Sequence, residues 1–415
     1  MRQTLFWIPY EVGGVPIFGV GVLLAIWLVL VAIAAVWQVR KYGGASVWGI
    51  LPAAFLVGAI IVFIPKAFPG AMPIRGYGVM LLAAVLAGTS LAIYRARQMG
   101  ADPEQILSVG FWMFVAGIFG ARLFHVIEYW ERDYQKGTWL ETLKAVVNIP
   151  AGGLVVYGSL IGGLLAFVVY MRKHKLPALA YADLIAPSLV LGLALGRIGC
   201  LLNGCCYGGP CHHPWAVTFP AESGPYDDQL VSGQLWGITF DRAQKRPVVK
   251  DIDGQSVLAH AGVEAGDRLV TINDFPARTV KSAKSLLEKF VREGEGLKIK
   301  LASGKEIRVS ASEVPQRSLP VHPTQIYSAI TASLLCLLLL AFYPFRRRDG
   351  EVIALLLTLY PISRFLIEII RTDEAPVFQT GMSISQNVSL LVLVAVVGFW
   401  MYLLSRPRSL AFAQS

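Results

Sequence analysis

The sequence predicts an all-α polytopic membrane protein with about nine transmembrane helices and a small α+β domain inserted in one extracytoplasmic loop. Of the 415 residues, 55% are hydrophobic and only 15% are charged, whereas a soluble domain has roughly 25% charged residues. Apolar runs long enough to cross a bilayer recur along the chain. One long polar stretch, at 203–324, interrupts them and supplies the residues for the inserted domain.

Each apolar run has a length close to the ~20 residues that a bilayer requires and carries few or no charges. The runs are residues 15–37, 47–64, 77–94, 106–127, 152–171, 184–202, 325–344, 352–370 and 388–404. The net charge of +10 is thus carried by a chain that is mostly apolar, with few polar segments where the charges can lie. That combination favours loops at an anionic membrane surface and disfavours nucleic acid as a partner.

Lys and Arg concentrate in alternate short loops, which places those loops in the cytoplasm. The loops in question contain Arg40, Lys41, Arg95, Arg97, Arg172, Lys173, Lys175, Arg346, Arg347, Arg348, Arg406 and Arg408. The N-terminus and the long polar stretch are then expected outside, and the C-terminus in the cytoplasm.

The polar stretch contains short alternating runs typical of strands at 268–273, 297–301 and 307–309. Between them, residues 280–291 have the apolar spacing of one helix. This order of elements, with the segment 261–273, resembles a PDZ domain, in which Gly237, Ile238, Thr239 and Phe240 would stand at the peptide carboxylate-binding loop. Such domains bind extended peptides by strand addition. A domain that serves only folding or docking is an equal alternative.

Ionisable residues inside the apolar runs are costly and usually functional. Arg122, Arg197, Arg364 and Glu368 fall in the later parts of spans that run outward, so these charges are expected in the outer half of the membrane. Tyr77 and Tyr157 open spans that run inward and lie at the same depth. The sequence thus predicts a polar site that faces the outer leaflet.

The spacing of Arg364, Glu368 and Arg371 puts them on one helical face. Two interpretations stay open for this face. The Arg364 guanidinium suits bidentate binding of a lipid phosphate, because its planar donors match phosphate oxygens. Alternatively, Arg364 and Glu368 neutralise each other within the helix. Arg197 has no acidic residue within one turn of its own helix, so a phosphate partner is the stronger interpretation there.

The segment Gly196-Arg-Ile-Gly-Cys-Leu-Leu-Asn-Gly-Cys-Cys-Tyr-Gly208 resembles the signature of the prolipoprotein diacylglyceryl transferase family. Blocks at 120–123, 152–162, 183–187, 322–327 and 363–373 agree with that family in order and spacing. The resemblance covers a seven-helix core from 77 to 404 and leaves out the first two spans and the PDZ-like insertion. It suggests extra helices at 1–70, a core divided into 71–230 and 317–415, and an inserted domain at 231–316.

The resemblance implies an enzyme of the bacterial cytoplasmic (inner) membrane that moves the diacylglyceryl group of phosphatidylglycerol to the lipobox cysteine of a preprolipoprotein signal peptide. It implies headgroup binding by Arg197 and a catalytic need for Arg364, and no cofactor. Catalytic roles are expected for Arg197, Arg364, Tyr157 and Glu368. Substrate contacts are expected at Arg197, Tyr77, Asn203, Gly208, Arg122 and His322.

Two positions depart from the family pattern. Many members have a histidine where this chain has Tyr157, and an asparagine where it has Cys200. A histidine base therefore does not carry over, and tyrosine, with a reference pKa of about 10, is a poor base at neutral pH. A thiol loses its proton more readily beside guanidinium groups. The hypothesis is that Arg197 and Arg364 stabilise the departing phosphate and the thiolate, while Tyr157 hydrogen-bonds to one of them.

Four cysteines, Cys200, Cys205, Cys206 and Cys211, cluster at the expected outer end of the sixth span. In an oxidising compartment a disulfide among them is favoured, with free thiols and metal or redox chemistry as alternatives. No metal site is expected, because the paired C-x-x-C spacing of structural zinc sites is absent. Cys336, in a leucine-rich run, is expected to be a packing residue.

Two other function classes remain open. A PDZ-containing intramembrane protease would need the H-E-x-x-H zinc motif, which the sequence lacks, or a serine and histidine pair such as Ser159 and His125. The other class is a transporter or a non-catalytic lipid carrier or scaffold, and a transporter would more often show internal repeats and substrate charges near the midplane. Charges displaced toward one face favour the transferase.

Overall fold

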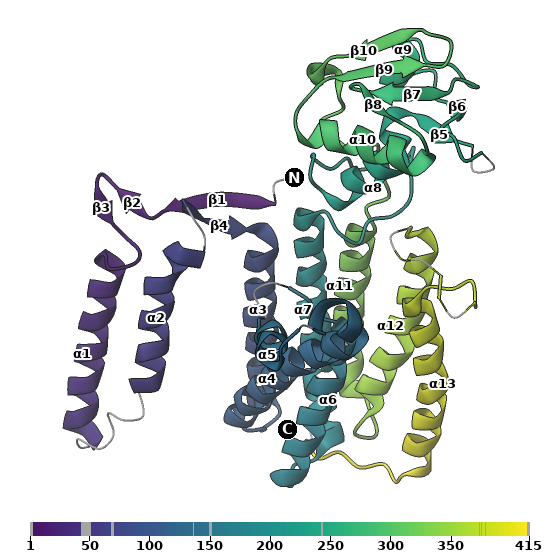
Figure 1. The fold of residues 1–415 in the computed structure, drawn as a ribbon. Coiled ribbons are helices and arrows are strands. Elements are labelled where there is room, and N and C mark those ends of the chain that lie inside the picture. Colours follow the sequence, from purple (N-terminus) through teal and green to yellow (C-terminus); the bar gives the residue numbers. More distant parts are fainter. Residues whose placement is uncertain are drawn as a thin grey trace.

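A bundle of long helices forms the body of the protein in this computed structural model, which describes residues 3–42, 51–67, 70–135, 137–148, 152–241, 244–372, 374, 376–377 and 379–412. The bundle consists of α3 (Gly76–Gln98), α4 (Pro103–Glu128), α6 (Val156–Lys173), α7 (Ala178–Asn203), α11 (Thr324–Phe342), α12 (Glu351–Ile370) and α13 (Ile384–Ser405). The closest pairs are α4 with α6, α3 with α7, α7 with α11 and α12 with α13 (Figure 1). Because α7 packs on both α3 and α11, it is the central helix.

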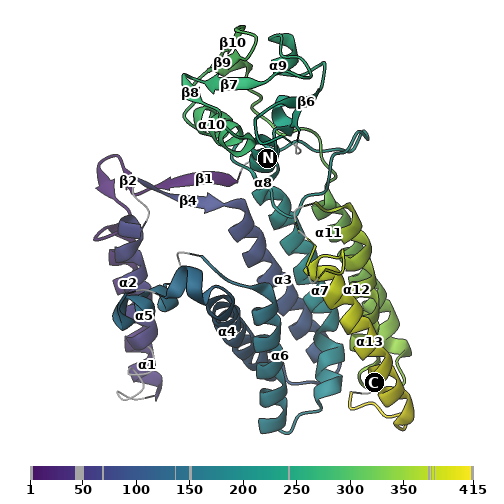
Figure 2. The ribbon, with the colours of Figure 1, turned by 45° about the vertical axis from the view of Figure 1, so that its right-hand side comes forward.

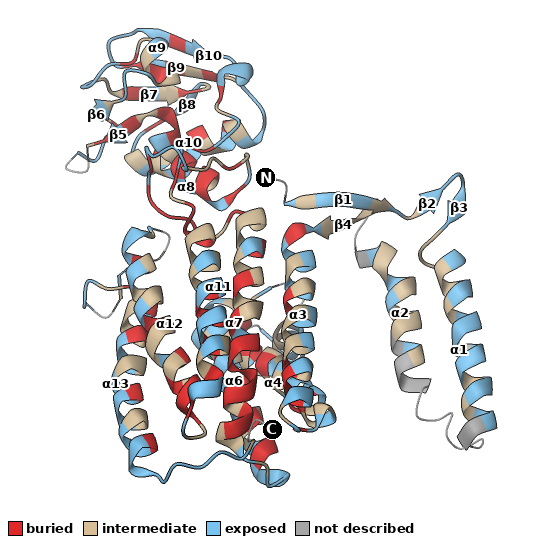
Figure 3. Cartoon of the chain, turned by 180° about the vertical axis from the view of Figure 1, so that it is seen from behind, coloured by how far each residue is buried: buried red, intermediate tan, exposed pale blue. Residues whose placement is uncertain are grey.

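Eight helices of the described residues are long and apolar enough to cross a membrane: these bundle helices and α1 (Val22–Tyr42). Figure 3 shows exposed residues over the outer faces of the bundle and buried ones where helices meet. Large apolar side chains such as Phe119 (76% exposed) and Leu391 (70%) lie on those outer faces. An apolar exterior around packed helices is the pattern of a polytopic membrane protein.

The N-terminal region differs from the sequence prediction. Residues 15–16 of the first predicted span form strand β3 (Val15–Pro16), paired with β2 (Glu11–Val12), and the helix begins only at Val22. Proline lacks the N–H that a helix needs, and Gly19 has φ +75°, which most residues avoid. Of the second predicted span, residues 47–50 lie outside the described residues. The helix that follows, α2 (Leu51–Ala67), contains an apolar helical stretch shorter than the eight spans, Val57–Lys66.

A two-stranded ribbon links this hairpin of helices to the bundle. Strand β1 (Thr4–Pro9) pairs antiparallel with β4 (Ala71–Arg75), which leads directly into α3. Figures 1 and 2 show the ribbon at the end of the bundle that carries the inserted domain, called here the domain end, and the C-terminus at the opposite end. The structure therefore places the N-terminal strand and the inserted domain on one side, as the sequence predicts, with the C-terminus on the other.

The inserted domain is a small α+β unit. Its strands are β5 (Ile238–Phe240), β6 (Val249–Ile252), β7 (Leu269–Ile272), β8 (Phe275–Pro276), β9 (Leu297–Leu301) and β10 (Glu306–Val309), and its helices are α8 (Gly224–Ser232), α9 (Val257–His260) and α10 (Val280–Arg292). One antiparallel sheet has the order β10-β9-β7-β8, and β5 and β6 form a separate hairpin. Strands β7, β9 and β10 and helix α10 fall where the sequence predicts them. The core also includes Tyr226 and Leu230 of α8, which precede the predicted boundary at 231.

Shorter helical segments complete the chain. They are α5 (Trp139–Val147), the π-helical turn η2 (Trp130–Tyr134), and the 3₁₀ turns η4 (Gln234–Trp236), η5 (Ala311–Glu313) and η6 (Tyr343–Phe345). Helix α5 lies across the direction of the long helices (Figure 2). It carries Trp139, Leu140, Leu143 and Val147 as exposed apolar residues, which suits a helix at a membrane interface.

A buried carboxylate fixes the bundle at the end opposite the domain. Asp183 of α7 is fully buried, and its two oxygens accept from the N–H groups of Gly350 (2.7 Å) and Ile353 (2.8 Å). These donors belong to the start of α12, where helical N–H groups lack partners inside the helix. Asp183 therefore supplies the N-terminal cap of α12 from another helix and sets the position of α12 against α7.

We expect Asp183→Asn to lower the free energy of unfolding by about 1–3 kcal/mol, because an amide retains one acceptor oxygen and leaves a buried N–H unsatisfied. Asp102→Asn is the matched control: Asp102 is exposed and caps α4 through Oδ1 to the Glu104 N–H (2.9 Å), a role that asparagine retains. Thermal unfolding of both variants in detergent measures the difference. Equal midpoints for the two variants would contradict the structural role of Asp183.

Candidate functional site

Three charged side chains of α12 lie together near the domain end, as their spacing predicts. Arg364 forms an ion pair with Glu368, and Arg371 Nη1 lies 3.3 Å from Glu368 Oε2. The side chains of Glu368 and Arg371 are 2% and 5% exposed, and that of Arg364 is 15% exposed. The helix-internal pairing of Arg364 and Glu368 is therefore confirmed. Such pairing offsets much of the cost of placing these ions in an apolar bundle.

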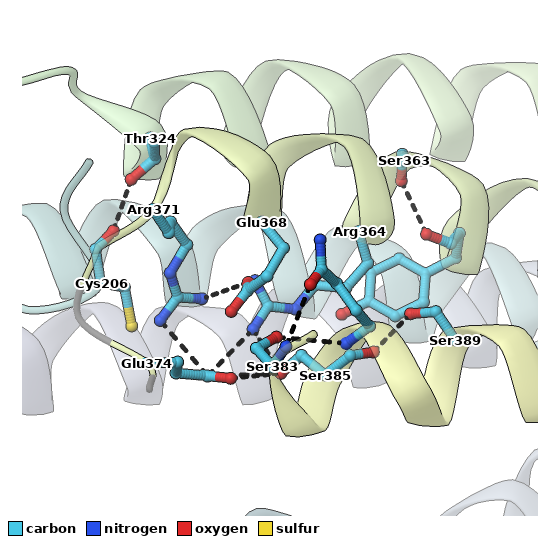
Figure 4. A network of polar contacts seen from close by, with 12 residues as sticks. Cys206, Thr324, Ser363, Arg364, Glu368, Arg371, Glu374, Ser383, Ser385 and Ser389 are labelled. Carbon is cyan, nitrogen blue, oxygen red and sulfur yellow. Dashed lines mark hydrogen bonds and ion pairs between the residues drawn. The ribbon is translucent and has the colours of Figure 1, made fainter. Parts of the chain in front are cut away.

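Two further side chains close this cluster into a network (Figure 4). The Arg364 Nη2 group donates to Ser385 Oγ (2.8 Å) and lies 3.3 Å from Glu374 Oε1. Ser385 donates to Glu374 Oε2 (3.0 Å), and Arg371 Nη2 lies 3.5 Å from Glu374 Oε1. Sequence reasoning missed Glu374 and Ser385, because one follows α12 in a loop and the other is an ordinary serine at the start of α13.

The electrostatics of the network keep Glu374 ionised. Burial raises the pKa of the Glu374 carboxyl, but hydrogen bonds with Glu368 and Ser385 and the positive charges of Arg371 and Arg364 outweigh burial. The pKa of Glu374 consequently lies below the ordinary value of a glutamate. The guanidinium groups of Arg364 and Arg371 thus face the carboxyl groups of Glu368 and Glu374 in one cluster.

Tyr157 joins the same network from a third helix. Its hydroxyl lies 3.3 Å from Ser385 Oγ, so the tyrosine reaches Arg364 through the serine. Helices α6, α12 and α13 meet at this point. The structure therefore brings together Tyr157, Arg364 and Glu368 of the predicted catalytic set.

Arg197 stands apart from these ion pairs. Within the described part of the chain, no hydrogen bond or ion pair of its guanidinium is present, and it lies at an apolar pocket of about 380 Å³ between α7 and α11. Besides Arg197, the pocket is lined by Ile198, Leu201, Gln325, Ile326, Ala329, Ile330, Ser333 and Leu334. A half-buried cation at the head of an apolar pocket matches the two chemical parts of a phospholipid.

The ring of Tyr77 packs against α7 beside these residues. A Cβ at Gly199 would lie 3.2 Å from Tyr77 Cδ2, so glycine permits this close approach. Tyr77 itself is 40% exposed. The structure places Tyr77 next to the Arg197 turn of α7, with its hydroxyl-bearing ring accessible from outside.

The loop after α7 is held in place by the segment that leads into α11. The Gly208 N–H donates to the His322 carbonyl (3.0 Å), and a Cβ at Gly208 would lie 2.7 Å from His322 Cβ. His322 Nδ1 lies 3.3 Å from the Tyr327 hydroxyl. The Asn203 carbonyl accepts from Gln3 Nε2 (3.2 Å) of the N-terminal segment. Gly208 and His322 therefore pack on each other, and Asn203 lies at the end of α7.

Arg122 has a structural environment that differs from the other arginines. Its guanidinium donates to the backbone carbonyls of five residues at distances between 2.6 and 3.0 Å. These are Ala145, Val146, Asn148, Gly152 and Gly153. Ala145 and Val146 belong to the last turn of α5 and Asn148 directly follows it, at a helix end where carbonyls lack partners. Arg122 thus caps α5 and binds the segment that leads into α6.

The five cysteines are all free thiols, and the disulfide expected from the sequence is not formed. The Sγ atoms of Cys200, Cys205 and Cys206 lie within 4.8 Å of one another. Cys211 is only 1% exposed and belongs to a different part of the loop, so the sequence cluster of four divides into three neighbours and one separate residue. Cys336 is buried in the bundle core, as expected for a packing residue.

The four residues expected at a peptide-binding loop lie at β5. Ile238 and Phe240 are buried in the domain core, and Thr239 is exposed. The N–H groups of Gly237 and Ile238 donate to the carbonyls of Gln234 (2.9 Å) and Gly233 (3.2 Å). Donors used in this way are not available to a peptide carboxylate.

The serine and histidine considered for proteolysis are not paired. His125 Nδ1 lies 2.9 Å from the Tyr134 hydroxyl, and no hydrogen bond between His125 and Ser159 exists among the described residues. Ser159 Oγ lies against α4 instead, 3.1 Å from where a Cβ on Gly117 would be. This geometry does not favour a serine protease.

Together, the fold and site define a polytopic membrane protein with a buried ionic network and an apolar pocket that is lined in part by Arg197. The model of the family "Prolipoprotein diacylglyceryl transferase" matches residues 65–402, and the chain belongs to this family. A phosphatidylglycerol--prolipoprotein diacylglyceryl transferase of Rhodopirellula baltica is 35% identical over 435 aligned positions, covering 95% of this chain and 88% of that protein. A Nostoc protein of the same name is 34% identical over 193 positions, covering 46% of this chain and 64% of its own length.

We expect Arg122→Lys to lower the free energy of unfolding by at least about 2 kcal/mol, because one ammonium group cannot satisfy five carbonyls in a planar array. Hydrogen exchange should rise at residues 139–147, since the cap of α5 is lost. The matched control is Arg132→Lys, at a side chain that is 69% exposed. Thermal unfolding and hydrogen exchange by mass spectrometry test this. Unchanged exchange at 139–147 would contradict the capping role.

Proposed function

We propose that the protein transfers the diacylglyceryl group of phosphatidylglycerol to the thiol of the lipobox cysteine of a prolipoprotein, the first step of bacterial lipoprotein maturation. The observation that carries the proposal is the position of Arg197 at the head of the apolar pocket between α7 and α11. Membership of the transferase family supports the same reaction. The enzyme would reside in the bacterial inner membrane.

In this proposal the lipid phosphate binds at Arg197 and the acyl chains follow the apolar wall of the pocket. The guanidinium has no protein partner within the described residues, so its donors are free for phosphate oxygens. Tyr77, at the start of α3, packs against this turn of α7 and would contact the headgroup. Gly208 and His322 would shape the wall beside it, and Asn203 would line the entrance.

The reaction forms a bond between the substrate sulfur and the glyceryl carbon and breaks the bond between that carbon and the phosphate oxygen. Glycerol 1-phosphate leaves with the electron pair, and the thiol proton is released. Arg197 and Arg364 would stabilise the negative charge that grows on the phosphate, which is the stage where fixed cations contribute most. Glu368 would hold Arg364 in place through their ion pair.

Tyr157 would act as a hydrogen-bond donor in this scheme. Its hydroxyl lies 3.3 Å from Ser385 Oγ, which in turn contacts Arg364 and Glu374. The chain Tyr157–Ser385–Arg364 would orient the guanidinium toward the substrate. Arg122, whose donors are used by backbone carbonyls, would support the site by fixing α5.

The direct experiment incubates the purified protein with phosphatidylglycerol vesicles and a lipobox peptide. A peptide mass gain of one diacylglyceryl group is the expected result. Cleavage of the peptide would instead indicate a protease, and an unchanged peptide a carrier or scaffold. Arg197→Gln should abolish transfer while thermal unfolding stays unchanged, and Arg132→Gln, at an exposed arginine, should retain it.

We expect Ser385→Ala to reduce the transfer rate at least tenfold, equivalent to about 1.4 kcal/mol in the barrier, because Arg364 loses its link to Tyr157. Ser389→Ala is the control one turn later on α13, where the hydroxyl only donates to the Ser385 carbonyl (2.7 Å). Tyr157→Phe is expected to follow Ser385→Ala. Full activity of Tyr157→Phe would remove Tyr157 from the mechanism.

The orientation and the inserted domain belong to the proposal as well. With arginine-rich loops in the cytoplasm, the domain end, the N-terminus and the active site face outward and the C-terminus faces the cytoplasm. The domain would be PDZ-like and bind an extended peptide along β5, which has β6 as its neighbour among the described strands. Because Gly237 and Ile238 use their N–H groups internally, the remaining edge of β5 on the side away from β6 would carry recognition, without a carboxylate-binding loop.

Peptide binding by the domain is tested with fluorescently labelled, extended prolipoprotein segments and the full-length protein. Thr239→Pro should weaken binding at least tenfold, because proline removes the N–H of Thr239, which faces β6, and so disturbs the strand that would receive the peptide. Thr239→Val retains that donor and is the matched control. Equal affinity of the two variants would contradict strand addition at β5 and leave folding or docking as the role of the domain.

A further inference from the structure

Three thiols meet at the domain end of α7. The Sγ atoms of Cys200, Cys205 and Cys206 all lie within 4.8 Å of one another, and all three side chains are partly buried. The turn that produces this arrangement is fixed from α11: the Cys205 carbonyl accepts from Gln325 Nε2 (2.7 Å) and the Cys206 carbonyl from Thr324 Oγ1 (2.6 Å). The thiols therefore sit on a backbone that is held by its neighbours.

The backbone conformation of Cys206 is a second indication that the surrounding structure fixes this turn. Its φ is +58°, a left-handed conformation that is uncommon for a residue with a side chain. Non-glycine residues hold such conformations where the surrounding structure requires them, often at functional sites. Here the conformation turns the chain directly after Cys205, so that adjacent cysteines point into one space with Cys200.

The distances suit a small thiophilic cation. Zinc binds thiolate sulfur at about 2.3 Å, so that three sulfurs on a tetrahedron around it lie about 3.8 Å apart, within the limit seen here. No histidine, aspartate or glutamate completes the group among the described residues. Three protein ligands with one open position are the pattern of catalytic zinc sites, whereas structural sites have four.

We propose that Cys200, Cys205 and Cys206 bind one Zn²⁺ ion as three thiolates, and that the substrate cysteine occupies the fourth position as a zinc-bound thiolate. This inference rests on the proposed transfer reaction and departs from the expectation of no metal. A bound zinc ion would make a base at the Tyr157 position unnecessary, where many family members have a histidine. A thiol that coordinates zinc is deprotonated without a protein base, so the proton leaves to water.

The surroundings of the thiols favour such a site. Arg197 precedes Cys200 by three residues on α7 and so lies on the same helical face. Figure 4 places Cys206 beside Arg371 at one end of the ionic network. Three thiolates around Zn²⁺ carry one net negative charge, and a fourth thiolate makes two, so the nearby guanidinium groups offset the charge of the complex.

The zinc-bound sulfur then has a defined role in the transfer. It attacks the glyceryl carbon of the lipid held at Arg197, the bond from that carbon to the phosphate oxygen breaks, and glycerol phosphate leaves with the electron pair. The product is a thioether, which is neutral and a weaker zinc ligand than a thiolate. Loss of charge on the sulfur would release the product and reopen the fourth position for the next substrate.

Metal binding is tested first, without reference to activity. The full-length protein, purified in detergent with a reductant, is dialysed against Zn²⁺ and then against metal-free buffer, and its zinc is measured by mass spectrometry. We expect about one zinc per chain. Cys200→Ser, Cys205→Ser and Cys206→Ser should each lose most of it, and Cys336→Ser, a buried thiol elsewhere, should retain it. Cobalt in place of zinc should show thiolate charge-transfer absorption that the three variants lose.

Two results would overturn the site: a wild-type protein without stoichiometric zinc, or zinc content that the three variants keep. The catalytic part is tested by removing zinc with a chelator, which should lower transfer at least tenfold, about 1.4 kcal/mol in the barrier, with recovery on adding Zn²⁺. Transfer at the full rate after zinc removal would overturn that part and leave the proposed function intact. Bound zinc without any transfer would support the site and contradict the proposed function instead.

Discussion

The ionic network of α12 is the constraint around which the domain end of the bundle is organised. Isolated charges inside an apolar bundle are costly, so Arg364, Glu368 and Arg371 require partners at close range. Glu374 and Ser385 supply the remaining contacts, and they do so from the loop after α12 and the start of α13. The requirement to neutralise these charges therefore fixes two helices and their connection, and it brings Tyr157 of α6 to the same place.

Backbone groups impose a second constraint of the same physical kind. Helix ends leave donors and acceptors without partners, and where such an end is buried another side chain has to supply them. Asp183 satisfies the start of α12 from α7, and Arg122 satisfies the end of α5 from α4. Arg122 looks like a candidate site residue in the sequence, because charges in apolar runs are rare, whereas Asp183 directly precedes the run 184–202. These contacts show that a buried charge can hold together two helices that are not adjacent in the sequence, as Asp183 does for α7 and α12.

The inserted domain leaves the core of the bundle undisturbed. It enters after α7 and returns before α11, and these two helices remain packed against each other with the Arg197 pocket between them. The same loop supplies Cys205, Cys206 and Gly208, so the insertion begins directly beside the candidate site.

The sequence by itself determined the membrane character, the bundle helices, the side on which the charges gather and the family, because these depend on composition, helical period and contiguous motifs. It also indicated the shared face of Arg364, Glu368 and Arg371, since local spacing decides it. Only the tertiary structure decided that Arg122 caps α5, that Ser385 links Tyr157 to Arg364, and that three of the four clustered cysteines meet while Cys211 does not. Those arrangements join residues from different helices and loops, and contacts between distant segments follow from packing, which no local pattern encodes.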